Sequence, residues 1–193
     1  MKSKNSFLLV LLLVSWFCAT GQTKMEFEKR IDRSEFPEAA LNWLEAHPEV
    51  PGEVRYYLEQ DGEQTTYEVK FKTSGNSFSI EFDQAGELLD VEIITRLRKI
   101  EEPRLGRIKA FLDQEYKKWK LDRLQRQYTV ADNGKQVLER IFKSDDSLIE
   151  NLEMELATRE NGETRHYELT FDPQGELIRK RVIEGLTYDY KKF

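Results

Sequence analysis

The chain of 193 residues has few of the side chains on which most enzymes depend. It contains one cysteine, Cys18, and two histidines, His47 and His166. One thiol cannot form an internal disulfide, and two separated histidines cannot supply the about four ligands of a zinc site. The G-x-x-x-x-G-K-S/T loop, the G-x-G-x-x-G turn and the G-x-S-x-G motif are absent from the sequence. We therefore expect no catalytic, metal-binding or cofactor-binding residues, and no enzymatic activity.

The one long apolar run lies near the start of the chain. Residues 7–14 read FLLVLLLV, follow a start that contains Lys2 and Lys4, and precede the small residues 19–21. This order is typical of a secretory signal peptide, and the run is shorter than the about 20 residues of a membrane-spanning helix. We therefore expect residues 1–21 to be a cleaved signal peptide. The mature protein is then periplasmic or secreted, with no membrane span after removal of the signal.

Cys18 lies inside this segment, so the mature chain would contain no cysteine. The alternative is a lipoprotein signal with lipid attached to Cys18, but the bulky Trp16 and Phe17 precede it where small residues are expected. The formal net charge is −6 and becomes −8 once the two lysines of the segment are removed. An acidic chain without a basic stripe disfavours nucleic acid and anionic membranes as partners.

One heptad occurs twice, as FDQAGEL in residues 82–88 and as FDPQGEL in residues 171–177. Asp at the first position and Gly at the fourth are typical of a type I turn closed by a left-handed glycine, which joins two antiparallel strands. The alternative is a calcium site. Calcium needs six to eight oxygen ligands, and each heptad offers two carboxylates. We therefore interpret both heptads as hairpin turns.

The two halves of the chain show similar hydrophobic periodicity. Apolar stripes at helical spacing predict helices over residues 35–46, 105–119 and 132–143. Alternation of apolar and polar residues predicts strands over residues 54–59, 67–72, 77–82, 89–93, 121–130, 152–156, 166–171 and 177–183.

These elements predict an α+β fold of two similar units. Each unit is expected to be a helix packed on an antiparallel β-meander, with an extra helix inserted in the second unit. The segment RLRKIEEP, residues 96–103, lies between the two patterns. We therefore expect the first unit to span residues 22–98 and the second unit to span residues 99–193.

Short stretches in both halves resemble PepSY-like domains. They are YEVKF (67–71) and the first heptad in one half, and YELTFD (167–172) with GEL (175–177) in the other. The chain from about residue 34 to residue 184 resembles the tandem PepSY-like proteins secreted by bacteria, whose fold is similar to that of the β-lactamase-inhibitory protein. The resemblance implies a non-catalytic module outside the cytoplasm, of a type proposed to inhibit or restrain peptidases. It supplies no catalytic residues.

One set of polar side chains is predicted to share a face of the first sheet. An antiparallel sheet can leave one face exposed to water, and Tyr and Arg are over-represented at protein interfaces. We predict that this face binds an envelope or secreted protein, the alternative being a solvated face without a partner. The candidate partner-binding residues are Arg55, Tyr57, Glu59, Glu68, Lys70 and Ser79.

Three functional hypotheses follow. The first is a non-catalytic protein-binding module, and the second, a narrower form of it, is an inhibitor of a peptidase or another hydrolase. The third is a hydrolase with a carboxylate pair, because 36 acidic residues provide many pairs. His47 and His166 fall in different halves, so we expect capping or surface roles for them.

Overall fold

A computed structural model describes residues 22–184, so the predicted signal peptide (1–21) and residues 185–193 lie outside the described residues. The strands are β1 (Gln22–Lys24), β2 (Glu26–Ile31), β3 (Arg55–Asp61), β4 (Gln64–Thr73), β5 (Asn76–Phe82), β6 (Leu88–Ile94), β7 (Trp119–Thr129), β8 (Asn151–Glu160), β9 (Glu163–Phe171) and β10 (Leu177–Ile183). The α-helices are α1 (Glu38–Glu45), α2 (Glu102–Glu115), α3 (Val130–Asn133) and α4 (Val137–Phe142), and the short 3-10 helices are η1 (Arg33–Glu35) and η2 (Leu97–Lys99). Within residues 22–184, no helix has the length and apolar character needed to cross a membrane.

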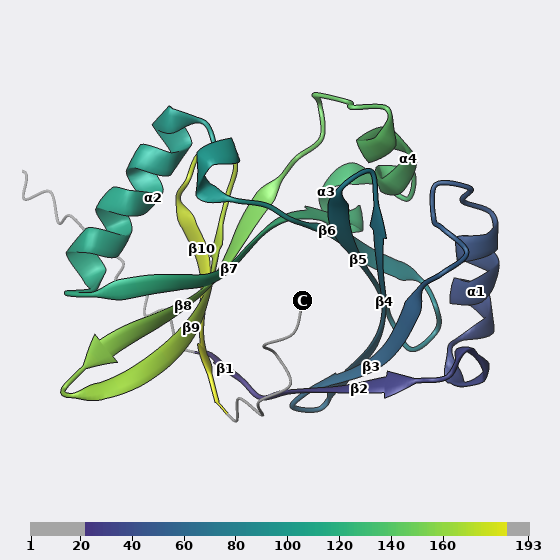
Figure 1. Cartoon of the computed structure of the whole chain (residues 1–193), viewed down its shortest axis with the longest axis horizontal. Coiled ribbons are helices and arrows are strands. Elements are labelled where there is room, and N and C mark those ends of the chain that lie inside the picture. Colours follow the sequence, from purple (N-terminus) through teal and green to yellow (C-terminus); the bar gives the residue numbers. More distant parts are fainter. Residues whose placement is uncertain (1–21, 185–193) are drawn as a thin grey trace, which may run out of the picture.

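The ten strands form one sheet in the order β1-β10-β9-β8-β7-β6-β5-β4-β3-β2. β2 pairs with β3 at one edge and β1 pairs with β10 at the other, and only Met25 separates β1 from β2. The N-terminal segment therefore joins both edges and closes the sheet into a ring (Figure 1). β1 and β2 each pair on one side only, β1 with Arg181–Ile183 of β10 and β2 with β3, so the closure is made by a short bridging segment.

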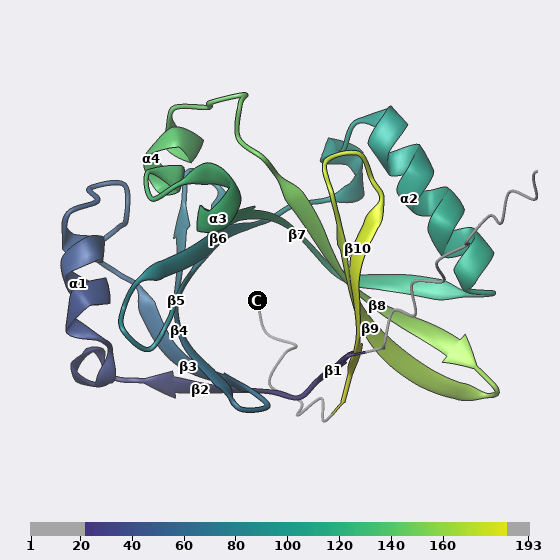
Figure 2. The ribbon, with the colours of Figure 1, turned by 180° about the vertical axis from the view of Figure 1, so that it is seen from behind.

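The helices lie outside this ring, and their apolar faces cover its outer surface (Figure 2). α1 and α4 pack on β3–β6, in a core that includes Phe36, Ala40, Val69, Phe82 and Val137. α2 packs on β7–β9, in a second core that includes Leu105, Leu112, Leu152, Leu169 and Phe171. Because side chains alternate between the two faces of a strand, the polar residues between these apolar positions point into the ring.

The fold is α+β, but it is built on one continuous sheet. The last strand of the first half, β6, pairs directly with β7 of the second half, for example Val91 with Tyr128. Two details of the predicted helices are wrong. The inserted helix over residues 132–143 is two short helices, α3 and α4, because Gly134 between them has φ of 80°. α2 ends at Glu115, and Trp119 already begins β7.

Both heptads form the predicted turn, with the same hydrogen bonds. Asp83 Oδ1 accepts from the backbone N–H groups of Ala85 and Glu87, both at 2.9 Å. Asp172 Oδ1 accepts from the N–H groups two and four residues later, at 2.8 and 2.9 Å. In each turn the carboxylate is used to fix the backbone.

The glycine of each turn also contacts the helix of its own half. Gly86 and Gly175 have φ of 81° and 85°, in the left-handed region. A Cβ atom on Gly86 would lie 2.7 Å from the backbone N of Ala40 in α1, and one on Gly175 would lie 3.0 Å from the carbonyl O of Arg104 in α2. Two separate features therefore favour glycine at each position: the left-handed backbone conformation, and the close approach of the helix, which leaves little room for a Cβ atom.

Candidate functional site

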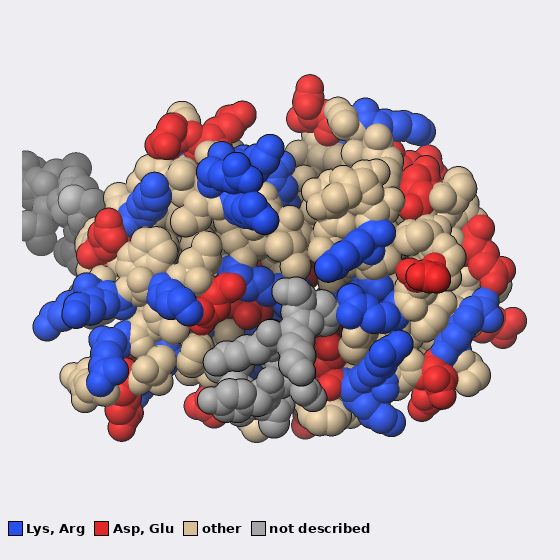
Figure 3. Space-filling view, viewed as in Figure 1, with Lys and Arg blue, Asp and Glu red and all other residues tan. Residues whose placement is uncertain are grey.

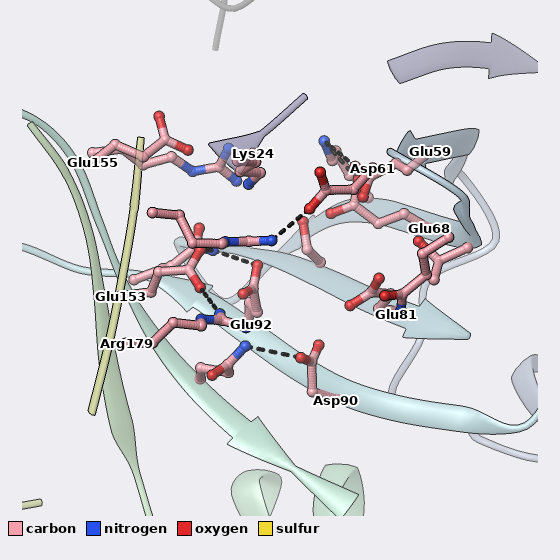
Figure 4. A pocket seen from close by; sticks show the side chains of 18 residues that line it. Lys24, Glu59, Asp61, Glu68, Glu81, Asp90, Glu92, Glu153, Glu155 and Arg179 are labelled. Carbon is pink, nitrogen blue, oxygen red and sulfur yellow. Dashed lines mark hydrogen bonds and ion pairs between the residues drawn. The ribbon is translucent and has the colours of Figure 1, made fainter. Parts of the chain in front are cut away.

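Charged side chains fill the inside of the ring around a cavity of about 170 Å³, here called the lumen cavity (Figure 4). The acidic residues that line it are Glu59, Asp61, Glu68, Glu81, Asp90, Glu92, Glu153 and Glu155. The basic residues are Lys24, Lys70, Arg123, Arg179 and Arg181. Since buried charges are stable only when they are paired or hydrogen-bonded, the arrangement of these groups decides what the lumen can do.

Lys70 lies at the centre of one cluster, here called the Lys70 cluster. Its Nζ forms a short hydrogen bond to Glu28, lies 2.7 Å from Glu68 Oε2 and 3.9 Å from Glu59 Oε1, and sits 4.9 Å from the centre of the Tyr57 ring. Burial alone would lower the pKa of Lys70, but the three carboxylates raise it well above its ordinary value. These carboxylates are close enough together to hold a metal ion. The ammonium group of Lys70 already lies among them.

All six predicted partner-binding residues gather at this cluster. Glu59, Glu68 and Tyr57 contact Lys70 as described, and Arg55 and Ser79 are its direct neighbours on β3 and β5. The register of β3, β4 and β5 places the six residues side by side. The expectation of an open face is wrong for Tyr57, Glu68, Lys70 and Ser79, which are each less than a tenth exposed, because β1 and β2 close the ring over them. Partner binding by these residues stays a prediction.

Glu168 holds a second cluster, here called the Glu168 cluster, at the closure of the ring. Its carboxylate is fully buried and lies 2.6 Å from both Lys24 Nζ and Arg181 Nη2, and 3.5 Å from Arg179. Burial alone would raise the pKa of Glu168, but Lys24 and Arg181 lower it below its ordinary value. Arg181 also reaches Asp61 at 2.5 Å, at the end of β3. These ion pairs tie β1 and β10 to each other and to the far edge of the sheet.

A third group, here called the carboxylate wall, comprises Asp90, Glu92 and Glu153 with two glutamines. Gln127 Nε2 donates to Asp90 at 3.0 Å, and Gln125 Nε2 donates to Glu92 at 2.5 Å and to Glu153 at 3.1 Å. Burial, and then the neighbouring carboxylates, raise the pKa of Glu153 to about 7 and those of Asp90 and Glu92 well above the ordinary range. The wall therefore holds protons at pH values where exposed carboxyl groups do not.

We expect this wall to make the folded protein less stable as pH rises. The folded state binds protons that the unfolded chain has already released, so the free energy of unfolding should decrease between about pH 5 and pH 7, by at most about 1.4 kcal/mol per pH unit for each such proton. Urea unfolding across this range measures the slope. Glu153→Gln should flatten it, while Asp146→Asn, a change at an exposed residue outside the lumen, should not. A free energy that stays constant or rises over this range would contradict the expectation.

A larger groove of about 910 Å³, here called the rim groove, opens where the end of β6 and η2 meet β7, β8 and β9. Its charged and polar lining is Thr95, Arg96, Arg98, Lys120, Asp122, Arg123, Glu155 and His166. Its apolar lining is Ile94, Leu97, Leu121, Leu124, Ala157 and Ile183. Lys and Arg side chains gather over the segment between β6 and α2 (Figure 3), so one side of the groove is basic.

The two histidines have separate partners. His47 Nδ1 lies 2.6 Å from the carbonyl O of Trp43 at the end of α1, and its ring stacks on the Trp43 ring at 3.7 Å. His166 Nδ1 lies 3.6 Å from Asp122 in the rim groove. A His–Asp pair orients a base, but a nucleophile must lie within reach as well. Thr95 provides the one hydroxyl group in the described lining of the groove.

The sequence interpretation missed the lumen residues of the second half and of the N-terminal segment. Asp90, Glu153 and Glu168 alternate with apolar neighbours in the same way as Glu68 and Lys70. The sequence therefore does show that these side chains lie on the polar face of their strands. The pattern does not show that the polar face is enclosed. It also does not show the contribution of Lys24 and Glu28, because their short strands lie before the first predicted element.

No family model matches the chain, and no curated protein matches it. Among solved structures, a DUF2874 family protein from Bacteroides uniformis is 16% identical, with a TM-score of 0.51 over 80% of this chain and 93% of that one. A DUF2874 family protein from Bacteroides ovatus is 15% identical, with a TM-score of 0.50 over 76% and 88%. A BLIP-like protein from Bacteroides fragilis is 15% identical, with a TM-score of 0.46 over 76% and 86%. At these identities the likeness to the first two concerns the fold alone.

Proposed function

We propose that the chain is a non-catalytic binding protein of the periplasm or the secreted space, and that it holds a partner protein in the rim groove. The observation that carries the proposal is the groove itself, whose size of about 910 Å³ suits a bound segment. The location agrees with the signal-like N-terminal segment. Several of the structural neighbours are provisionally described as periplasmic proteins.

The chemistry of the rim groove favours an acidic partner segment with apolar side chains. Four basic residues and two acidic ones line the groove, and Ile94 at its edge is 41% exposed. Arg side chains form strong paired hydrogen bonds with carboxylates, and apolar lining gains by excluding water. Inhibition of a peptidase or another hydrolase is a narrower form of the same proposal, in which the bound segment belongs to that enzyme.

The architecture is consistent with two related PepSY-like units within the one sheet. Each half has a helix, four consecutive strands and the same heptad turn, and each heptad glycine touches the helix of its own half. Under this proposal the boundary between residues 22–98 and 99–193 falls beside the rim groove. The groove then lies at the junction of the two units, a common position for binding sites.

A hydrolase with a carboxylate pair is the second candidate, because the lumen does bring carboxylates with divergent pKa values together. Arg179 contacts both Glu153, whose pKa is raised to about 7, and Glu168, whose pKa is lowered. An acid and a carboxylate base of this kind act in glycosidases. The cavity of about 170 Å³ is smaller than the about 300 Å³ at which ligand pockets begin. Release of nitrophenol from nitrophenyl glycosides, lost in Glu153→Gln, would establish this alternative.

Site-specific crosslinking tests the binding proposal. A photo-crosslinking amino acid at Ile94, which lines the groove at its edge, should capture a specific protein in the envelope or culture fraction of producing cells. The same amino acid at Ile149, which is 43% exposed and outside the groove, should not. Arg96→Glu together with Arg98→Glu should reduce the captured product at least about tenfold, because the bound segment is acidic. Equal capture at both positions, or none at Ile94, would contradict the proposal.

A further inference from the structure

The cations of the lumen neutralise the carboxylate wall only in part. Arg179 pairs with Glu153 at 3.0 Å and Arg123 acts on Glu92, but within residues 22–184 no ion pair reaches Asp90. Of the residues that line the cavity, eight are acidic and five are basic, and three of the basic ones belong to the Glu168 cluster. Within residues 22–184, the side chain of Asp90 receives one hydrogen bond, from Gln127. The charged groups that shift the pKa of Asp90 most, Glu81, Glu153 and Glu68, are all acidic and raise it.

Two acceptor atoms of the wall have no donor among the described residues, namely Asp90 Oδ1 and Gln125 Oε1. Asp90 is 6% exposed and Gln125 is 4% exposed, and both line the cavity. The orientation of Gln125 is fixed, because its Nε2 donates to Glu92 and Glu153. A buried acceptor left without a donor destabilises the folded state until a donor reaches it. A ligand that satisfies the wall would therefore carry a positive charge and N–H donors.

The Lys70 cluster shows which kind of cation the lumen accommodates. There an alkylammonium group lies among Glu28, Glu59 and Glu68. Within residues 22–184, Glu28, Glu59 and Glu68 form the one group of three carboxylates close enough together to hold a metal ion. The carboxylates of the wall are therefore too far apart to bind the same metal ion. In Figure 4, Asp90 and Glu92 lie between Glu153 on one side and Glu68 on the other. An organic cation can spread its donors over such separated acceptors, whereas a metal ion cannot.

We propose that the carboxylate wall binds a small organic cation, an aliphatic ammonium or guanidinium group, which donates to Asp90 Oδ1 and Gln125 Oε1. A cavity of about 150 Å³ holds a molecule as large as benzene, so the lumen cavity of about 170 Å³ accepts about six non-hydrogen atoms. Such a group can be a free amine or the end of a Lys or Arg side chain of a partner. The site does not depend on the rim groove, and it is tested with the isolated protein.

Binding should be linked to proton release. Burial raises the pKa of Asp90 and Glu92, and the groups that face them are Glu68, Glu81 and Glu153, with Arg123 near Glu92. A bound cation replaces the proton in neutralising these carboxylates, so affinity should rise with pH until the wall is ionised.

Calorimetric titration of the full mature chain with butane-1,4-diamine, at about pH 8 and low salt, tests the site. We expect saturable binding that Asp90→Asn weakens at least about tenfold, because the change removes the charge and keeps a side chain that can still accept from Gln127. The matched variant Asp146→Asn, outside the lumen, should bind as the natural chain does. Butan-1-ol, which has no charge, should not bind. Heats measured in buffers of different ionisation enthalpy should show proton release.

Each outcome decides for or against the site. Binding of an Nα-acetyl-lysine amide without binding of the free diamine still supports the ammonium site and assigns its source to a partner side chain. Absence of heat with every amine, equal affinity in Asp90→Asn, or binding of Ca²⁺ in place of amines would overturn the proposal. If Asp90→Asn does not fold, Glu92→Gln is used in its place, and the rise in Tm caused by the diamine is measured. A rise in Glu92→Gln as large as in the natural chain would also overturn the proposal.

Discussion

Glu168→Gln is expected to destabilise the folded protein by about 3–5 kcal/mol. Glu168 is fully buried and pairs with Lys24 and Arg181 at 2.6 Å. Loss of its charge would remove the carboxylate that both cations share inside the ring, and breaking a buried ion pair is among the largest effects of a single substitution. Because these ion pairs lie where β1 meets β10, we expect the ring to open there first. Urea unfolding at about pH 7 measures the change, and faster amide exchange in β1 and β10 would locate it.

The control for this change is Glu45→Gln. Glu45 pairs with Arg33 on the surface, where the two side chains are 67% and 56% exposed, so its loss should change the free energy of unfolding by less than about 1 kcal/mol. The pKa of Glu168 is lowered, so its contribution is present above the ordinary glutamate pKa of 4.5 and is lost only as pH falls through the lower folded value. Equal effects of the two substitutions at about pH 7 would show that the Glu168 cluster does not hold the ring.

Gly86→Ala is expected to destabilise the protein by about 2–5 kcal/mol. The left-handed backbone of Gly86 costs an L residue about 1–2 kcal/mol, and the added Cβ would lie 2.7 Å from the backbone N of Ala40 and 2.9 Å from the Cβ of Ala39. Because backbone cannot move aside as a flexible side chain does, α1 must shift on the sheet, with an overpacking cost of about 1–3 kcal/mol. Thermal and urea unfolding measure the effect.

Gly62→Ala separates the two causes. Gly62 has φ of 61°, but an added Cβ would meet nothing within 4 Å, so its replacement should cost only the backbone term of about 1–2 kcal/mol. The heptad glycine of the second half, Gly175, should fall between the two, because its nearest contact is 3.0 Å, to Arg104. If Gly62→Ala proved as damaging as Gly86→Ala, the contact between the heptad turn and the helix would have no energetic role.

Much of the candidate site could be predicted from the local pattern alone. Alternation of Glu68 and Lys70 with Val69 and Phe71 fixes which side chains share a face, since the period of a strand is two residues. That is why the six predicted residues do gather in space. The same pattern does not state whether the polar face meets water or another part of the sheet, so the buried state of Lys70 was not predictable.

The sequence by itself determined most of the secondary structure, the apolar face of the predicted elements and the two heptad turns, because these depend on side chains that are neighbours along the chain. Only the tertiary structure decided that β1 and β2 join the two edges of the sheet, and that the inner face therefore encloses paired and unpaired charges. The physical reason is distance along the chain. Arg181 meets Asp61 across 120 positions, and Glu168 and Lys24 shift the pKa of Glu153 more than Glu155 of its own strand does.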